Sequence, residues 1–349
     1  MIRRLERLVE AVQTNCHVAD ARHAGDLTLC TYLLEMLEFY RWERGMAFTD
    51  QPMRAEVGKW IVEREALWES LAEAHFMPLP VEEQGFEPFA AAALNELLAP
   101  HGLVYGAGIG RFGKPQFFLG QLMREEYRDG VRIFVAGREY ARDLTGTPAA
   151  LLGSTIYVRQ ESLKRWLWQK YEAWALRKPA GALKATLQAY GFGIDPLAAL
   201  ERMAESESET LILHELGEHA AGQLLGEDWA TMRADLSRRR AELFLRAVRD
   251  NLADCLVTLP TLLDRKASTS LDFWFSNFDG MRRELFPQLG TAYSAWLDSE
   301  DEWVLRDAIS AGGEHWLRIC TCALALHREC GAEAEGEIEA LIDAPSTSL

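Results

Sequence analysis

The chain has 349 residues and a formal net charge of −16, because 53 Asp and Glu residues outnumber 37 Lys and Arg residues. Apolar residues make up 48% and aromatic residues 10%, which excludes a wholly disordered chain. Nucleic acid and anionic membrane surfaces are not expected as partners, since basic faces bind them. The length predicts roughly two domains, or one domain with an insertion.

The N-terminal stretch Met1–His17 is charged and amphipathic, without the apolar core of a signal peptide. No stretch approaches the ~18 apolar residues that a membrane span needs. The six cysteines form no C-x-x-C pair, which is typical of reduced thiols. We therefore expect a cytoplasmic protein of bacterial type, and the sequence leaves its oligomeric state open.

Residues 1–100 show the apolar spacing of helices, interrupted by the breaker run MPLPVEEQG at residues 77–85. Residues 101–160 contain short β-type runs, with the turn signal Asp129-Gly130 between two of them. Residues 161–349 return to helical spacing, with helices expected at 208–225 and 229–259 among others.

These patterns predict an α+β fold that is mainly α-helical, with one small antiparallel β-sheet at about residues 101–160. The β-type runs follow one another without intervening helices, which favours antiparallel pairing. The chain then consists of an N-terminal helical region (1–100), the β region (101–160) and a C-terminal helical region (161–349).

The β region contains a glycine pattern, Gly108-x-Gly110-x-x-Gly113, that matches the dinucleotide fingerprint. The fingerprint binds a pyrophosphate only where its loop opens a helix. Here Lys114-Pro115 and a β-type run follow, so we expect a hairpin connection and no nucleotide site.

The segment TLILHELGEHAAG, residues 210–222, places two histidines and two carboxylates within six residues: His214, Glu215, Glu218 and His219. Such groups on a helix with an apolar face are costly unless they have partners. Zinc is one candidate partner, since it binds imidazoles and a carboxylate and can keep an open position for water.

The two histidines are five residues apart, about 140° around a regular helix. A regular helix would therefore splay them. One extra residue in a π-bulge would realign them, and Gly217 could relax there.

The hexapeptide His214–His219 resembles the His-Glu-x-x-Gly-His motif of zinc peptidases of dipeptidyl peptidase III type. That family has a later motif, Glu-Glu-x-x-Ala-Glu/Asp, which residues 249–254 resemble, with Arg249 in place of an acid. The resemblance implies zinc ligands at His214, His219 and Asp250. It also implies Glu215 as the general base and Asp254 as a carboxylate that orients a histidine.

Simple geometry favours a different third ligand. If residues 208–225 and 229–259 form a straight helical hairpin, Asp235 faces the motif and Asp250 lies ~20 Å further along. A break near Ser237 or a wider crossing of the two helices would be needed to bring Asp250 to the motif. In the alternative without a metal, His214–Glu218 and Glu215–His219 are ordinary i,i+4 pairs.

A second polar cluster lies near the N-terminus, where His17, Asp20, His23 and Asp26 follow at three-residue steps. Glu35 and Glu38 lie on the next predicted helix, and bundle helices with such groups build di-iron and di-manganese sites. Iron or manganese held by both clusters is therefore the alternative to zinc. Local pairing of His17 with Asp20 and of His23 with Asp26 is the structural alternative.

Two further patterns are better explained as core. A zinc knuckle can be drawn from Cys320, Cys322, His327 and Cys330, but no turn is signalled between them. The aromatic run Leu271–Gly280 could wall a pocket, but such runs more often pack inside.

The leading hypothesis is a zinc-dependent, peptidase-like hydrolase, in which Glu215 takes a proton from metal-bound water that attacks a peptide or small-molecule substrate. The second is a metal-binding helical protein without hydrolytic activity. The third is a helical scaffold or interaction protein in which the histidines are structural.

Overall fold

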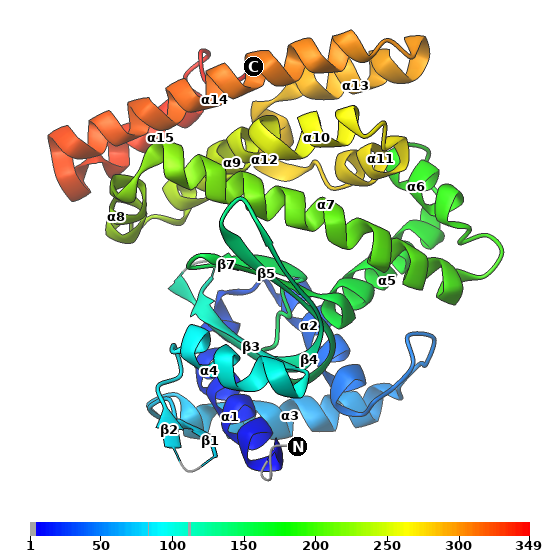
Figure 1. The fold of residues 1–349 in the computed structure, drawn as a ribbon, viewed down its shortest axis with the longest axis vertical. Helices are drawn as coiled ribbons and strands as arrows, with labels where there is room; N and C mark the ends of the chain where they lie inside the picture. The colour runs from blue at the N-terminus through cyan, green and yellow to red at the C-terminus, as the bar shows by residue number, and fades with distance from the viewer. Residues whose placement is uncertain (1–4, 83, 111–112) are drawn as a thin grey trace. The chain divides into compact units, whose positions relative to one another are not determined.

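The computed structural model describes residues 5–82, 84–110 and 113–349, and Figure 1 shows its helices and strands. The chain divides into two compact units, Met1–Glu172 and Ala173–Leu349. Residues 1–100 and 101–160, which we treated above as separate regions, contribute to the same N-terminal unit. Its main core joins α1 to the strands that follow.

The N-terminal unit contains helices and short 3₁₀ turns around one larger sheet. Its helical elements are α1 (Leu5–His23), η1 (Ala24–Asp26), α2 (Leu29–Glu43), α3 (Arg54–Leu71), α4 (Ala91–Leu98), η2 (Ala99–His101) and the first part of α5 (Gln160–Arg177). The strands of the larger sheet are β3 (Leu103–Ile109), β4 (Pro115–Arg128), β5 (Val131–Arg142), β6 (Ala149–Leu152) and β7 (Thr155–Arg159). Their order in the sheet is β3-β4-β5-β7-β6.

The prediction of one small antiparallel sheet is wrong. The five-stranded sheet is mixed, because β5 and β7 run parallel. A second sheet, made of β1 (Leu79–Val81) and β2 (Gln84–Phe86), lies in the region predicted as helical. Close spacing suggested antiparallel pairs throughout, but after Arg142 the chain first forms β6. It then turns at Gly153, so β7 enters the sheet between β5 and β6.

One local turn was predicted correctly from the sequence. The predicted turn at Asp129-Gly130 is confirmed, since both residues have positive φ (50° and 80°) and join β4 to β5.

The sheet is curled so that its two edge strands approach each other. A Cβ atom added to Gly108 of β3 would lie 2.9 Å from Leu152 Cβ of β6, so this approach requires glycine. Gly106 and Gly108 thus belong to a strand and not to a loop that opens a helix. Arg111 and Phe112 lie outside the described residues.

The C-terminal unit is helical. It contains α6 (Ala182–Tyr190), α7 (Pro196–Leu225), α8 (Glu227–Asp235), α9 (Arg239–Ala253), a π-helical turn η4 (Asp254–Thr258), α10 (Leu259–Asp264), α11 (Ser268–Ser276), α12 (Gly280–Leu285), α13 (Pro287–Ser299), α14 (Glu302–Cys330), η5 (Gly331–Ala334) and α15 (Glu335–Asp343). The predicted helix over 229–259 is therefore interrupted twice, first at residues 236–238 and then by the π turn.

Helix α7 is 30 residues long and begins with a strong local signal. The Asp195 side chain accepts a hydrogen bond from the backbone N–H of Ala198 over 3.1 Å, and Pro196 occupies the first helical position. The inner face of α7 packs on η4 and α9, with Leu213, Ala221 and Leu225 in the core. This packing fixes where the side chains of the hexapeptide His214–His219 lie.

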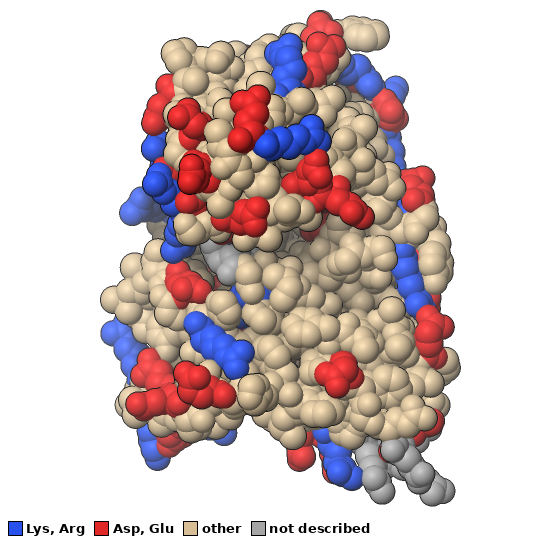
Figure 2. Space-filling model, turned by 90° about the vertical axis from the view of Figure 1, so that its left-hand side faces the viewer, with Lys and Arg blue, Asp and Glu red and all other residues tan. Residues whose placement is uncertain are grey.

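The surface is charged and mixed in sign. On the face shown in Figure 2, basic side chains stand among acidic ones. Surface ion pairs include Arg306 with Asp264, at 2.9 Å. Within residues 5–82, 84–110 and 113–349, every helix is too short or too polar to cross a membrane.

Candidate metal centre

Helix α7 approaches the facing chain very closely at Gly217. A Cβ atom added there would lie 2.4 Å from the carbonyl oxygen of Ala253, so only glycine permits the contact. The π-bulge at Gly217 that would align the two histidines is not formed, because α7 is regular α-helix from Pro196 to Leu225. The π turn lies instead in the facing segment, Asp254–Thr258.

Across this contact, three side chains offer ligand atoms that lie within 4.8 Å of one another: His214, Glu218 and Asp250. His214 Nε2 is 3.6 Å from Glu218 Oε1, and the two side chains are 21% and 12% exposed. Asp250 is buried. One imidazole nitrogen and two carboxylates could contact a single divalent cation together.

Asp254 orients the imidazole. His214 Nδ1 donates a hydrogen bond to Asp254 Oδ1 over 2.9 Å, and Trp274 Nε1 donates to the same oxygen over 3.1 Å. Burial would raise the pKa of Asp254, but Arg282 and His214 outweigh it and lower this pKa. The ionised Asp254 therefore holds His214 with Nε2 directed toward Glu218.

Arginines already neutralise the two carboxylates. Arg249 Nη2 lies 2.7 Å from Glu218 Oε1 and 3.3 Å from Asp250 Oδ1. Arg246 Nε lies 3.6 Å from Asp250 Oδ2. Burial opposes ionisation of Glu218, yet Arg249 and His214 hold its pKa well below the usual range. A metal ion would have to take the place that Arg249 occupies between the carboxylates.

The positive charge of His214 also favours an ion-pair network over a bound metal ion. Burial lowers its pKa, but Asp254 and Glu218 outweigh burial and raise the pKa well above its usual value. A metal ion could bind Nε2 only after the imidazolium had released its Nε2 proton to the solvent.

Three residues considered in the sequence lie elsewhere. His219 Nε2 is 3.0 Å from Gln223 Nε2, because five residues on a regular helix rotate it away from His214. Glu215 is 6% exposed and helps to raise the pKa of Arg249, but it is not one of the three groups that meet. Asp235 pairs with His327 Nε2, at 2.9 Å.

The structure brings Asp250 rather than Asp235 to the motif. The chain leaves helical geometry between α8 and α9, so it does not form the straight hairpin in which Asp235 would face the motif. Asp250 and Asp254 then lie one turn apart on the inner face of the second segment. The four arginines near the site, Arg233, Arg246, Arg249 and Arg282, were missed. Two of them, Arg246 and Arg249, fall in the segment 246–254, where alternating charges are easily taken for a solvated face.

The N-terminal cluster has separate partners within its own unit. His17 Nε2 lies 2.7 Å from Arg64 Nη1, and Trp68 Nε1 donates to Nδ1 over 3.3 Å. Asp20 pairs with Lys114 Nζ, at 2.6 Å, and not with His17. The local His23–Asp26 pair is formed at 3.1 Å, and Glu38 pairs with Arg41 at 2.6 Å.

Because His17 is buried, we expect the protein to lose stability as the pH falls. Burial and, second, the charge of Arg64 lower its pKa from 6.5 to about 3. Between these values the unfolded chain binds more protons, so the free energy of unfolding falls as pH drops from 6.5 toward 3, by at most ~1.4 kcal/mol per pH unit. Urea unfolding between pH 4.5 and 7 should show a shallower pH dependence for His17→Gln than for wild type. The exposed control His101→Gln should keep the wild-type slope, and equal slopes for all three would contradict the assignment.

A buried charge network in the N-terminal unit was not anticipated. Arg159 Nη1 lies 3.2 Å from Asp143 Oδ1, and Arg159 also pairs with Glu139. Lys114 joins Asp143 to Asp20. All five side chains are at most 11% exposed. They come from α1, from strands β5 and β7, and from the connections at Lys114 and Asp143. Charged residues inside the β-type runs were the signal available.

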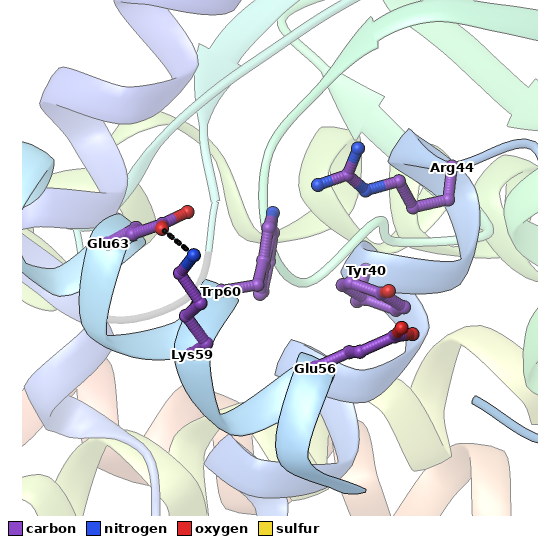
Figure 3. Close-up of a pocket in the computed structure, with 6 residues that line it drawn as sticks. All are labelled: Tyr40, Arg44, Glu56, Lys59, Trp60 and Glu63. Carbon is purple, nitrogen blue, oxygen red and sulfur yellow. Dashed lines mark ion pairs between the residues drawn. The ribbon is translucent and has the colours of Figure 1, made fainter. Parts of the chain in front are cut away.

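A shallow hollow of about 430 Å³ lies between α2 and α3, and Figure 3 shows its lining. Trp60 and Tyr40 are buried and form its floor. Of the charged groups at its rim, Lys59 pairs with Glu63 at 3.8 Å, and the Arg44 guanidinium lies 5.7 Å from the Tyr40 ring centroid. This is ordinary surface chemistry and supports no assignment.

The remaining sequence patterns are structural. Trp274 and Phe278 of the aromatic run stack on each other at 5.0 Å within the C-terminal core. Cys320 is buried there, whereas Cys322 and Cys330 are exposed, so the three thiols do not share one environment.

Comparison with known proteins gives a family. Residues 7–159 match the N-terminal domain, and residues 164–345 the C-terminal domain, of a family of unknown function (DUF6866). No curated protein and no solved structure matches the chain. The boundary between the two matches lies near the division of the structure at Glu172. The chain belongs to the family of unknown function DUF6866.

Proposed function

We propose that the C-terminal unit binds one divalent metal ion, with zinc as the first candidate, through His214, Glu218 and Asp250. The observation that carries this proposal is the meeting of their three ligand atoms within 4.8 Å across the contact between α7 and α9. One nitrogen and two oxygen donors suit zinc, and manganese or iron are the alternatives.

The surroundings of His214 support the proposal. In metal sites, a ligating histidine usually donates its other N–H to a carboxylate, which fixes the tautomer and raises the basicity of the ligand. Asp254 makes this contact with Nδ1 and is itself held by Trp274 and Arg282. The π turn that begins at Asp254 contributes to this placement.

Hydrolysis is a separate step, and the proposal concerns binding alone. The resemblance assigns the general base to Glu215 and a ligand to His219, and neither is among the three groups that meet. A peptide or small-molecule substrate thus stays a prediction from the sequence.

A metal titration with matched histidine variants tests the proposal. We expect wild-type protein, purified without a metal-affinity tag and stripped with chelator, to bind about one zinc ion per chain in calorimetry. His214→Ala should lose at least about tenfold in affinity, since it removes the sole nitrogen ligand. His219→Ala, five residues away on the same helix, should bind as wild type does.

The same titration can overturn the proposal. Wild-type protein that takes up no zinc, manganese or iron would leave the cluster as an ion-pair network within a helical scaffold. Equal loss in both histidine variants would favour the ligand set that the peptidase resemblance implies. Thermal unfolding of each variant checks that the fold is intact.

A further inference from the structure

Three arginines gather beside the carboxylates of the proposed metal site. Arg249 contacts Glu218 and Asp250, and Arg246 contacts Asp250 from the next turn of α9. Arg233 belongs to α8, and after burial the positive charges of Arg249 and Arg246 are what lowers its pKa most.

These guanidinium groups are not fully satisfied. Within the part of the chain that the structure describes, Arg233 Nε and Arg249 Nε are buried and have no hydrogen-bond partner. Leaving a buried charged donor unpaired is costly. Arg246 and Arg249 are also 22% and 14% exposed, so a small solute can reach the cluster from the surface.

Charge balance shows what a metal ion would change. Arginines and carboxylates in direct contact here are equal in number: Arg246, Arg249 and Arg282 with Glu218, Asp250 and Asp254. A divalent ion adds two positive charges while His214 loses its Nε2 proton, so the site gains one net positive charge, and the ion takes Glu218 and Asp250 away from Arg249. Glu215 and Glu242 also attract these arginines, but each already has other interactions. The loaded site thus gains a positive excess beside freed guanidinium groups.

Resting on the proposed metal site, we infer that the metal-loaded C-terminal unit binds a small oxyanion, of the phosphate or carboxylate class, through Arg249, Arg246 and Arg233. Guanidinium groups present forked donors that match the oxygens of both classes. Without metal, Glu218 and Asp250 occupy the guanidinium groups of Arg249 and Arg246 from within the protein. Metal and oxyanion therefore bind cooperatively, and each raises the affinity for the other by the same factor.

Inorganic phosphate and acetate are the probes. Wild-type protein is loaded with one zinc ion, freed of excess zinc by gel filtration, and titrated with each anion beside the metal-free protein. We expect phosphate to bind at least about tenfold more tightly to the loaded protein. Arg233→Gln should lose about tenfold of that affinity with unchanged zinc content, because Arg249 and Arg246 are the arginines that form the ion pairs with Glu218 and Asp250. Arg233→Lys should retain more of the phosphate affinity. The control Arg240→Gln, which removes an exposed pair with Asp343, should bind as wild type does.

Each outcome decides a separate point. Zinc uptake with equal phosphate affinity in loaded and metal-free protein would overturn the oxyanion site and leave the metal site standing. Full phosphate affinity in Arg233→Gln would overturn the arginine assignment. Failure to take up zinc would overturn both proposals. Acetate binding as tightly as phosphate would assign a carboxylate ligand, and acetate failing where phosphate binds would assign a phosphate group.

Discussion

Replacing Gly217 with alanine is expected to lower the free energy of unfolding by about 3 kcal/mol, the upper range for overpacking a buried contact. The new methyl group would lie 2.4 Å from the carbonyl oxygen of Ala253, and both partners are backbone or attached directly to it. Neither can rotate away, so α7 and the facing segment must move apart. The movement would separate His214 from Asp254, and zinc binding should weaken with stability.

Gly222→Ala is the matched control on the same helix. Nothing lies within 4 Å of a Cβ atom added to Gly222, and alanine is the better helix former, so this variant should be stabilised by up to about 1 kcal/mol. Chemical unfolding of the full chain, followed by tryptophan fluorescence, measures both variants. A Gly217→Ala protein as stable as Gly222→Ala would refute the close packing of α7 on Ala253.

Replacing Lys114 with methionine should cost about 3 to 5 kcal/mol, the loss typical of removing one partner from a buried ion pair. Lys114 Nζ is 2.6 Å from Asp20 and 3.8 Å from Asp143, and both carboxylates are fully buried. Burial raises the pKa of Asp20, and the positive charge of Lys114 opposes this rise. Without the ammonium group, Asp20 would be buried as an unpaired charge or forced to take up a proton.

Lys59→Met removes the same charge from an exposed site in the same unit. Lys59 and Glu63 are 81% and 61% exposed and 3.8 Å apart, so this pair should contribute under about 0.5 kcal/mol. Urea unfolding compares the two lysine variants. Similar losses for both would mean that Lys114 is hydrated and that the N-terminal network is not buried.

Local signals in the sequence predicted local structure well. The Asp129-Gly130 turn joins β4 to β5, as its turn signal predicted. Strand order was not predictable in this way, because the parallel β5–β7 pair depends on the return of the chain through β6. Residues 149–152 read Ala-Ala-Leu-Leu, and neither alanine nor leucine favours strands.

The candidate site was predicted in part. The motif residues His214 and Glu218 meet Asp250 and Asp254, two of the residues that the resemblance named. Their meeting depends on the interruption between α8 and α9, which the sequence allows but does not specify. His219 was included because the peptidase resemblance implies it as a ligand, which requires a distortion of the helix at Gly217. The distortion lies on the facing chain instead, where no glycine or proline marks its first residues.

The central claim, that α9 supplies a metal ligand to α7, is tested most directly by two aspartate variants. Asp250→Asn and Asp235→Asn remove the same charge from the two positions that the sequence left open. After equilibrium dialysis against zinc, elemental analysis should find about one zinc ion per chain in wild type and in Asp235→Asn, and far less in Asp250→Asn. Full zinc content in Asp250→Asn would contradict the account and leave its carboxylate as a partner of Arg249 and Arg246 alone.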